Sequence, residues 1–189
     1  MVIATRLVEA EGLDALQARR IAKEADCAVG SLYNVFGDID GLISAVNGRT
    51  LGRLGEQLST ALGDAKDGDV RARLLALALS YVRFAVNNRR AWDAVFKHRR
   101  AAGNPVPQAY VDDQLRLIAV IEGVIAGRSV DAGTRGTQAR ALFGAIHGIV
   151  SLALDDRLGG IARAELEPQV RFMVDVITRG LPTPAPTTS

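Results

Sequence analysis

The stretch CAVGSLYNVFGDIDGL, Cys27–Leu42, decides the fold of this chain. Leu32 and Phe36 stand four positions apart, so on a helix they share one face and can join a small core. The remaining side chains include a hydroxyl, a phenol and an amide, from Ser31, Tyr33 and Asn34. A core does not need that combination, whereas a surface that holds a polar partner does. The stretch therefore predicts a short helix with one buried and one functional face.

The sequence on either side predicts a helix-turn-helix unit, two short helices with a tight turn between them and a longer support helix behind. Gly37 is a typical helix stop, and Asp38 is a good N-cap for the long helix that follows. The expected helices are Gln17–Ala25, Ala28–Val35 and a long helix from Asp38 to about Leu62. In such a unit the second helix enters the major groove with its N-terminal end forward.

Helical spacing of apolar residues continues to the end of the chain, and no stretch alternates as a strand does, so we expect an all-α fold. The polar turn Gly63–Asp69 separates the long helix from the next one. The later helices are expected at Val70–Val86, around Trp92 and Phe96, from about Pro105 or Gln108 to Ala126, from about Thr134 to Leu158 and at roughly Glu165–Arg179. The proline-rich residues 181–189 are expected to be a disordered tail.

Composition limits the classes of protein that fit. The chain has 189 residues, 48% of them hydrophobic, with a net charge of +2 and one cysteine. An internal disulfide is excluded, no apolar run is long enough to span a membrane, and we expect no signal peptide and a cytoplasmic location. Residues 1–50 hold five basic and seven acidic residues, so composition alone gives little support for binding DNA.

The segment LDALQARRIAKEADCAVGSLYNVFGDIDGLISAV, Leu13–Val46, resembles the N-terminal DNA-binding domain of the TetR/AcrR family of transcriptional regulators. The matching motifs are RRIA, GSLYNVF and GDIDGL. Further along, YVRFAVNNRRAWDAVF and FGAIHGIV are similar to the tryptophan and histidine-glycine segments of one C-terminal subtype. The resemblance implies a three-helix DNA-binding domain in residues 1–46 and, joined to it by the long helix, a helical effector-binding and dimerisation domain in residues 47–180.

The resemblance also implies which residues meet DNA. These are Gln17 and Arg19 at the start of one helix, and Ala28, Val29, Gly30, Ser31, Tyr33 and Asn34 on the recognition helix. Three positions depart from the family pattern: Asp26 stands where glycine is usual, Ala28 replaces a hydroxyl N-cap, and Ile39 replaces a lysine. We therefore expect modest phosphate affinity per subunit and a dependence on dimerisation. Arg19 and Arg20, each taken singly, fit a solvated charge pair nearly as well as a phosphate contact, and Cys27 is expected in the core.

Aromatic residues outside the first domain could converge on one apolar pocket, the usual character of a small-molecule site. The candidate effector-binding residues are Tyr81, Phe84, Trp92, Phe96, Tyr110, Phe143 and His147. Each of them could also be plain core, and His147 fits a satisfied core histidine as well as a pocket residue. His98, within KHRR, is expected to be exposed.

The last two helices predict a homodimer interface. A stripe of small residues would let another helix backbone come close: Thr137, Ala141, Gly144, Gly148 and Ser151. The final helix has two apolar faces, one with Val170 and Val174 and another with Phe172 and Val176. One face would pack inside the subunit and the other against its partner.

These features favour a transcriptional repressor that leaves a palindromic double-stranded DNA operator when a small apolar or amphipathic effector binds. Gly48, Gly52 and Gly55 of the long helix are the hypothetical joint for that response. Two scattered histidines and one cysteine offer no converging catalytic groups, so we expect no enzyme, metal or cofactor. A helical dimeric adaptor, or a small-molecule-binding protein without DNA binding, stays open because residues 1–50 lean acidic.

Overall fold

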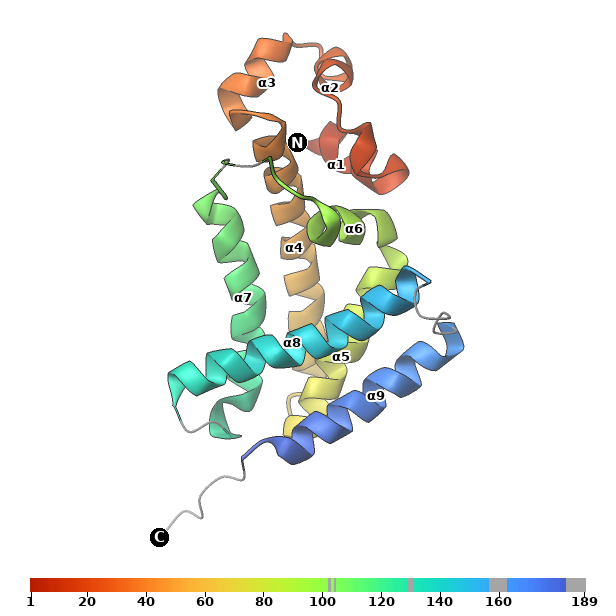
Figure 1. The fold of residues 1–189 in the computed structure, drawn as a ribbon, viewed down its shortest axis with the longest axis vertical. Coiled ribbons are helices and arrows are strands. Elements are labelled where there is room, and N and C mark those ends of the chain that lie inside the picture. Colours follow the sequence, from red (N-terminus) through yellow and green to blue (C-terminus); the bar gives the residue numbers. More distant parts are fainter. Residues whose placement is uncertain (102, 104, 129–130, 157–162, 183–189) are drawn as a thin grey trace. The chain divides into compact units, whose positions relative to one another are not determined.

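The computed structural model describes the chain except for residues 102, 104, 129–130, 157–162 and 183–189, and the described residues form helices without a strand (Figure 1). The expected tail largely lies outside the described residues. The helices are α1 (Val2–Glu11), η1 (Leu13–Ala15), α2 (Ala18–Glu24), α3 (Val29–Phe36), α4 (Ile39–Asp64), α5 (Val70–Asn87), α6 (Arg89–Lys97), α7 (Gln108–Ile125), η2 (Ala126–Arg128), α8 (Ala132–Leu154) and α9 (Arg163–Gly180). The predicted all-α fold is confirmed.

Local sequence explains where several of these helices begin and end. Gly12 and Gly37 follow α1 and α3 with φ of 92° and 77°, a left-handed conformation that glycine adopts without steric cost. Asp38 caps α4 as expected, because the Gly41 N–H donates to its Oδ1 at 2.7 Å. Asp131 caps α8 in the same way through the Thr134 N–H at 2.9 Å, and the Thr134 hydroxyl donates to Asp131 Oδ2 at 2.7 Å. The hydroxyl bond first, and then the N–H bond, lowers the pKa of the Asp131 carboxyl.

The chain divides into two compact units, the first made of residues 1–54 and 87–114 and the second of residues 55–86 and 115–189. The first unit contains α1, η1, α2, α3 and α6, with parts of α4 and α7. Its core is a cluster of aliphatic side chains: Ala4, Leu7, Val8, Ala15, Leu16, Ile21, Leu42, Ile43, Val46, Ala91 and Ala94. Leu32 and Phe36 of α3 pack against this cluster, as the sequence predicts.

The second unit contains α5, α8, α9 and the remaining parts of α4 and α7. In α9, Val170 and Val174 are buried, and α8 and α9 lie against each other. The Gln57 side chain of α4 donates to the Ser80 carbonyl of α5 at 2.8 Å. The Arg71 guanidinium of α5 pairs with Asp175 of α9 at 2.7 Å and lowers the pKa of that carboxyl. None of the described helices is long and apolar enough to cross a membrane.

Candidate nucleic-acid interface

The turn between α2 and α3 is tight, and the helix that follows it begins without a side-chain cap. Asp26 has φ of 51°, the left-handed conformation that explains the usual glycine at this position. The Cys27 N–H then donates to the Ala22 carbonyl at 3.0 Å. Ala28 occupies the N-cap of α3 without a side-chain hydrogen bond, so the first amide groups of α3 receive no side-chain acceptor from that position.

Cys27 corrects one expectation, because its side chain is exposed instead of buried in the core. The residue lies in the turn itself, directly after the left-handed Asp26, and the α3 side chains that reach the core come later, at Leu32 and Phe36. The matching position in the family predicts a small apolar residue at Cys27. It does not show whether this turn places the side chain inside or outside the core.

Most of the predicted DNA-contact residues at α3 are exposed, whereas Val29 is half-buried. Gly30, Ser31, Tyr33 and Asn34 are all exposed, with Tyr33 at 44%. Val35 was not among the predicted contact residues, yet it is 73% exposed. A valine on a short amphipathic helix is typical of a core position, so its exposure is not predictable from the sequence. The helix therefore separates into a core side and a free side.

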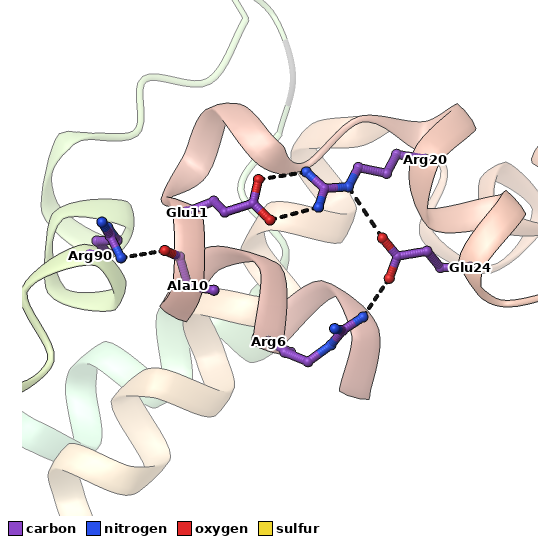
Figure 2. A network of polar contacts seen from close by, with 6 residues as sticks. All are labelled: Arg6, Ala10, Glu11, Arg20, Glu24 and Arg90. Atoms are coloured by element: carbon purple, nitrogen blue, oxygen red, sulfur yellow. Dashed lines mark hydrogen bonds and ion pairs between the residues drawn. The ribbon is translucent and has the colours of Figure 1, made fainter.

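On α2, two neighbouring arginines have different surroundings. Arg20 donates two hydrogen bonds to Glu11, at 2.6 and 2.7 Å, and a third to Glu24 at 3.2 Å (Figure 2). These bonds raise the pKa of Arg20 and lower that of Glu11. Arg6 of α1 pairs with Glu24 of α2 at 2.5 Å. Arg20 thus ties α2 to α1, whereas Arg19 is exposed and has no ion pair among the described residues.

Most acids of the DNA-binding segment are engaged in contacts within the first unit. Glu11 and Glu24 belong to the network of Figure 2, and Glu9 pairs with Arg53. Asp38 caps α4, and Asp40 is buried. By contrast, three exposed basic residues form no ion pair within the described part of the chain, namely Arg19, Lys23 and Arg49. The excess of acidic over basic residues in this segment therefore overestimates the negative charge that is free to repel DNA.

Asp40 is the centre of a buried polar cluster that the sequence did not predict. Its Oδ1 lies 3.0 Å from His98 Nε2, and its Oδ2 accepts the Ala101 N–H at 2.9 Å. Arg100 donates to the Asp40 main-chain carbonyl at 3.0 Å and to the Ser44 hydroxyl at 2.6 Å. The expectation that His98 is exposed is wrong, since only 13% of its side chain is accessible. The cluster fixes the segment after α6 to the first turn of α4.

Four of the seven candidate effector residues lie in the second unit, three of them in contact with one another. The Tyr81 hydroxyl lies 2.7 Å from His147 Nδ1. The Phe143 ring stacks on His147 at 5.4 Å and meets the edge of Tyr81 at 5.7 Å. Burial lowers the pKa of His147, which favours the neutral imidazole. Phe84 of the same unit is buried.

The other three candidates belong to the first unit. Trp92 is only 1% exposed and its ring lies 5.1 Å from that of Phe96. The Tyr110 hydroxyl donates to the Val95 carbonyl at 3.5 Å, and burial raises the pKa of this tyrosine. The seven residues are thus divided between the two units, and their convergence on one pocket stays a prediction.

The two short helices, their tight turn and the free face of α3 define a helix-turn-helix DNA-binding protein. Residues 2–46 match the family of bacterial regulatory proteins called the tetR family, and residues 74–177 match the tetracyclin repressor-like C-terminal domain. The second match spans more than half of the chain. The chain belongs to the TetR family and is a DNA-binding transcriptional regulator.

Solved structures share this architecture. A protein of unknown function from Rhodococcus sp. RHA1 is 26% identical with a TM-score of 0.75, over 96% of this chain and 92% of that one. The regulator FadR from Bacillus subtilis, solved with stearoyl-CoA, is 15% identical with a TM-score of 0.67 over 94% and 95%. A possible TetR-family regulator from Streptomyces coelicolor A3(2) is 20% identical with a TM-score of 0.64 over 94% of both chains. No curated protein sequence matches this chain significantly.

Proposed function

We propose that this regulator is a homodimeric repressor that binds a palindromic operator and leaves it when a small apolar or amphipathic effector binds. The observation that carries the proposal is the division of α3, with Leu32 and Phe36 on the core and Tyr33 and Asn34 exposed. In a dimer, two such helices would enter successive major grooves about 34–36 Å apart.

The DNA contacts follow from exposure and charge. Gln17 and Arg19 at the start of α2 are exposed and would bind phosphate, together with Tyr33 and Asn34. Residues at the start of α3 would meet base edges, namely Ala28, Val29, Gly30 and Ser31. Ser31 supplies a hydroxyl, and Gly30 has open space around it that lets a backbone come close.

The surface of α8 and α9 supports a homodimer through these helices. Phe172 and Val176 lie one turn apart on α9 and are 65% and 45% exposed. On α8, a Cβ atom at Gly144 or Gly148 would meet no atom within 4 Å. Large apolar side chains on one helix and small residues on the other are what a tight helix–helix interface requires.

Replacement of Phe172 by Glu tests this interface. Because the change buries a charge only if the proposed interface forms, we expect Phe172→Glu to produce monomers in analytical ultracentrifugation. The matched control is Leu115→Glu on α7, another apolar residue of the second unit that is 52% exposed. A Phe172→Glu protein that stays as dimeric as the control excludes α9 from the interface.

The effector is inferred from the aromatic residues. Tyr81, Phe143 and His147 form one cluster with a neutral imidazole, which suits a largely apolar ligand with one polar group. The fold is able to hold a long-chain ligand, since the FadR structure contains stearoyl-CoA. An effector can shift the protein away from DNA only through its higher affinity for the form that does not bind DNA.

The direct test measures ligand binding and operator binding on the same protein. Long-chain fatty acids, acyl-CoA thioesters and smaller apolar compounds are screened by thermal shift, and each compound that binds is titrated into the full-length protein–operator complex. We expect a stabilising ligand to lower operator affinity, and Tyr81→Phe to require more of that ligand. A ligand that stabilises the protein and leaves operator affinity unchanged contradicts the proposed induction.

Gly52→Ala in α4 tests the hypothetical joint separately. The site is exposed, and an added Cβ atom would meet nothing within 4 Å, so a steric clash does not confuse the result. If bending at Gly52 transmits effector binding, the variant binds operator normally and responds less to effector. An unchanged response removes Gly52 from the mechanism.

A further inference from the structure

Val35 on α3 is an aliphatic side chain that the protein leaves 73% exposed. On a helix it shares a row with Ser31, four positions earlier, and Ala28, seven positions earlier. Both of those residues are also exposed. The neighbouring face of α3, roughly 60–100° around the helix from Val35, contains Leu32 and Phe36, which pack against the core of the first unit. Because most of its surface is accessible, Val35 contributes little to the core of the first unit.

We propose that Val35 is a specificity-determining residue that contacts thymine methyl groups in the major groove of the operator. This inference rests on DNA binding through α3. The C5-methyl group of thymine is the one apolar group that base pairs present in the major groove. Valine has no donor or acceptor beyond its main chain, so its side chain cannot bind phosphate or a polar base edge. Its two methyl groups match the thymine methyl in chemistry.

The neighbouring side chains favour a DNA duplex as the partner of this row. Ala28 and Ser31 are small, so they leave room for the base edges to approach Val35. Arg19 and Lys23 lie one turn apart on the adjacent α2, are exposed, and form no ion pair within the part of the chain that the structure describes. The two positive charges would bind the phosphate backbone and so orient the protein on the duplex. The small apolar row would contact the bases and so determine which sequence is bound.

The experiment replaces single methyl groups of the DNA. Binding sites are selected from random DNA with the full-length protein, and each thymine of the selected half-site is replaced by deoxyuridine, which lacks the methyl. We expect at least one such replacement to weaken wild-type binding about three- to fivefold, the scale of one lost methyl contact. The same replacement leaves Val35→Ala unaffected. Val106→Ala, at an exposed valine outside α2 and α3, is the matched control and keeps the wild-type sensitivity.

The proposal is overturned if every deoxyuridine replacement has the same effect on the wild type and on Val35→Ala. It is also overturned if Val35→Ala changes the oligomeric state and leaves methyl sensitivity intact, because a second copy of the chain then covers the residue. Failure of this proposal still leaves a selected DNA sequence, whereas failure of DNA recognition through α3 yields no selected sequence at all.

Discussion

His98 Nε2 lies 3.0 Å from Asp40 Oδ1, and this buried pair joins the segment after α6 to the first turn of the helix that supports α3. The other carboxylate oxygen accepts the Ala101 N–H at 2.9 Å. Removal of the carboxylate leaves the Ala101 N–H without its acceptor and takes away the carboxylate oxygen beside His98 Nε2. A lost hydrogen bond to a buried charged group costs about 1.5–3 kcal/mol. The Asp40 carboxylate should therefore stabilise the first unit, although its partners are far from it in the sequence.

We expect Asp40→Ala to lower the free energy of unfolding by about 2–3 kcal/mol. Urea unfolding followed by Trp92 fluorescence measures it, since Trp92 is the one tryptophan of the chain and is buried in the same unit. Asp14→Ala is the control, because Asp14 is an exposed acid, and should change stability by less than about 0.5 kcal/mol. Equal losses in the two variants contradict the structural role of Asp40.

Gly41 is required by the close approach of α4 to the end of α3. A Cβ atom there would lie 1.9 Å from the Phe36 carbonyl oxygen, which is main chain and cannot move aside. Gly41→Ala should destabilise the protein by about 1–3 kcal/mol or more, the cost of overpacking. Gly52→Ala has open space and should stabilise α4 by about 0.5–1 kcal/mol. Thermal unfolding followed by circular dichroism should show shifts of opposite sign; shifts of the same sign disprove the steric argument.

The neutral His147 predicts a pH dependence of stability. Its pKa in the folded protein lies below the ordinary value, so the unfolded chain binds the proton first as the pH falls through about 6.5. Stability should therefore decrease below that pH, and His147→Gln should reduce this decrease. The capped Asp131 and the paired Asp175 also have lowered pKa values, but their contribution is lost only below about pH 4. Urea midpoints measured between pH 5 and 7.5 separate the contribution of His147 from that of the two aspartates. Identical pH profiles for the wild type and His147→Gln would show that His147 does not cause the decrease.

Arg19 and Arg20 offer a matched pair for phosphate binding. Arg19 is exposed, whereas Arg20 is held by Glu11 and Glu24. If Arg19 binds phosphate, Arg19→Ala reduces the slope of log affinity against log salt by about one per subunit. Arg20→Ala should change this slope less and weaken the attachment of α2 to α1. Fluorescence anisotropy between 50 and 200 mM salt distinguishes them, and an equal change in slope for both refutes the assignment.

The sequence predicted what local spacing controls. The two faces of α3, the stop at Gly37 and the cap at Asp38 depend on residues within one or two helical turns, and the structure confirms all three. What it missed depends on contacts between distant segments. His98 is largely shielded from solvent because Asp40, far away in sequence, lies beside it. The exposure of Cys27 and Val35 depends on how the α2–α3 turn orients short segments, which apolar periodicity does not reveal.

The candidate effector residues show the same limit. Tyr81, Phe143 and His147 lie on two helices whose pairing brings them together, and the sequence could name them only as aromatic residues on apolar faces. Trp92 and Phe96 lie in the other unit. Whether such residues share a site depends on tertiary packing, which no local pattern fixes.

Selection of binding sites from random DNA shows whether the free face of α3 reads an operator as part of a dimer. We expect an enriched palindrome whose half-sites are about 10–10.5 base pairs apart, or a multiple of that distance. The double variant Tyr33→Ala and Asn34→Ala should fail to enrich this palindrome. An enriched sequence without two-fold symmetry, or equal enrichment by the double variant, would show that α3 does not read DNA in this way.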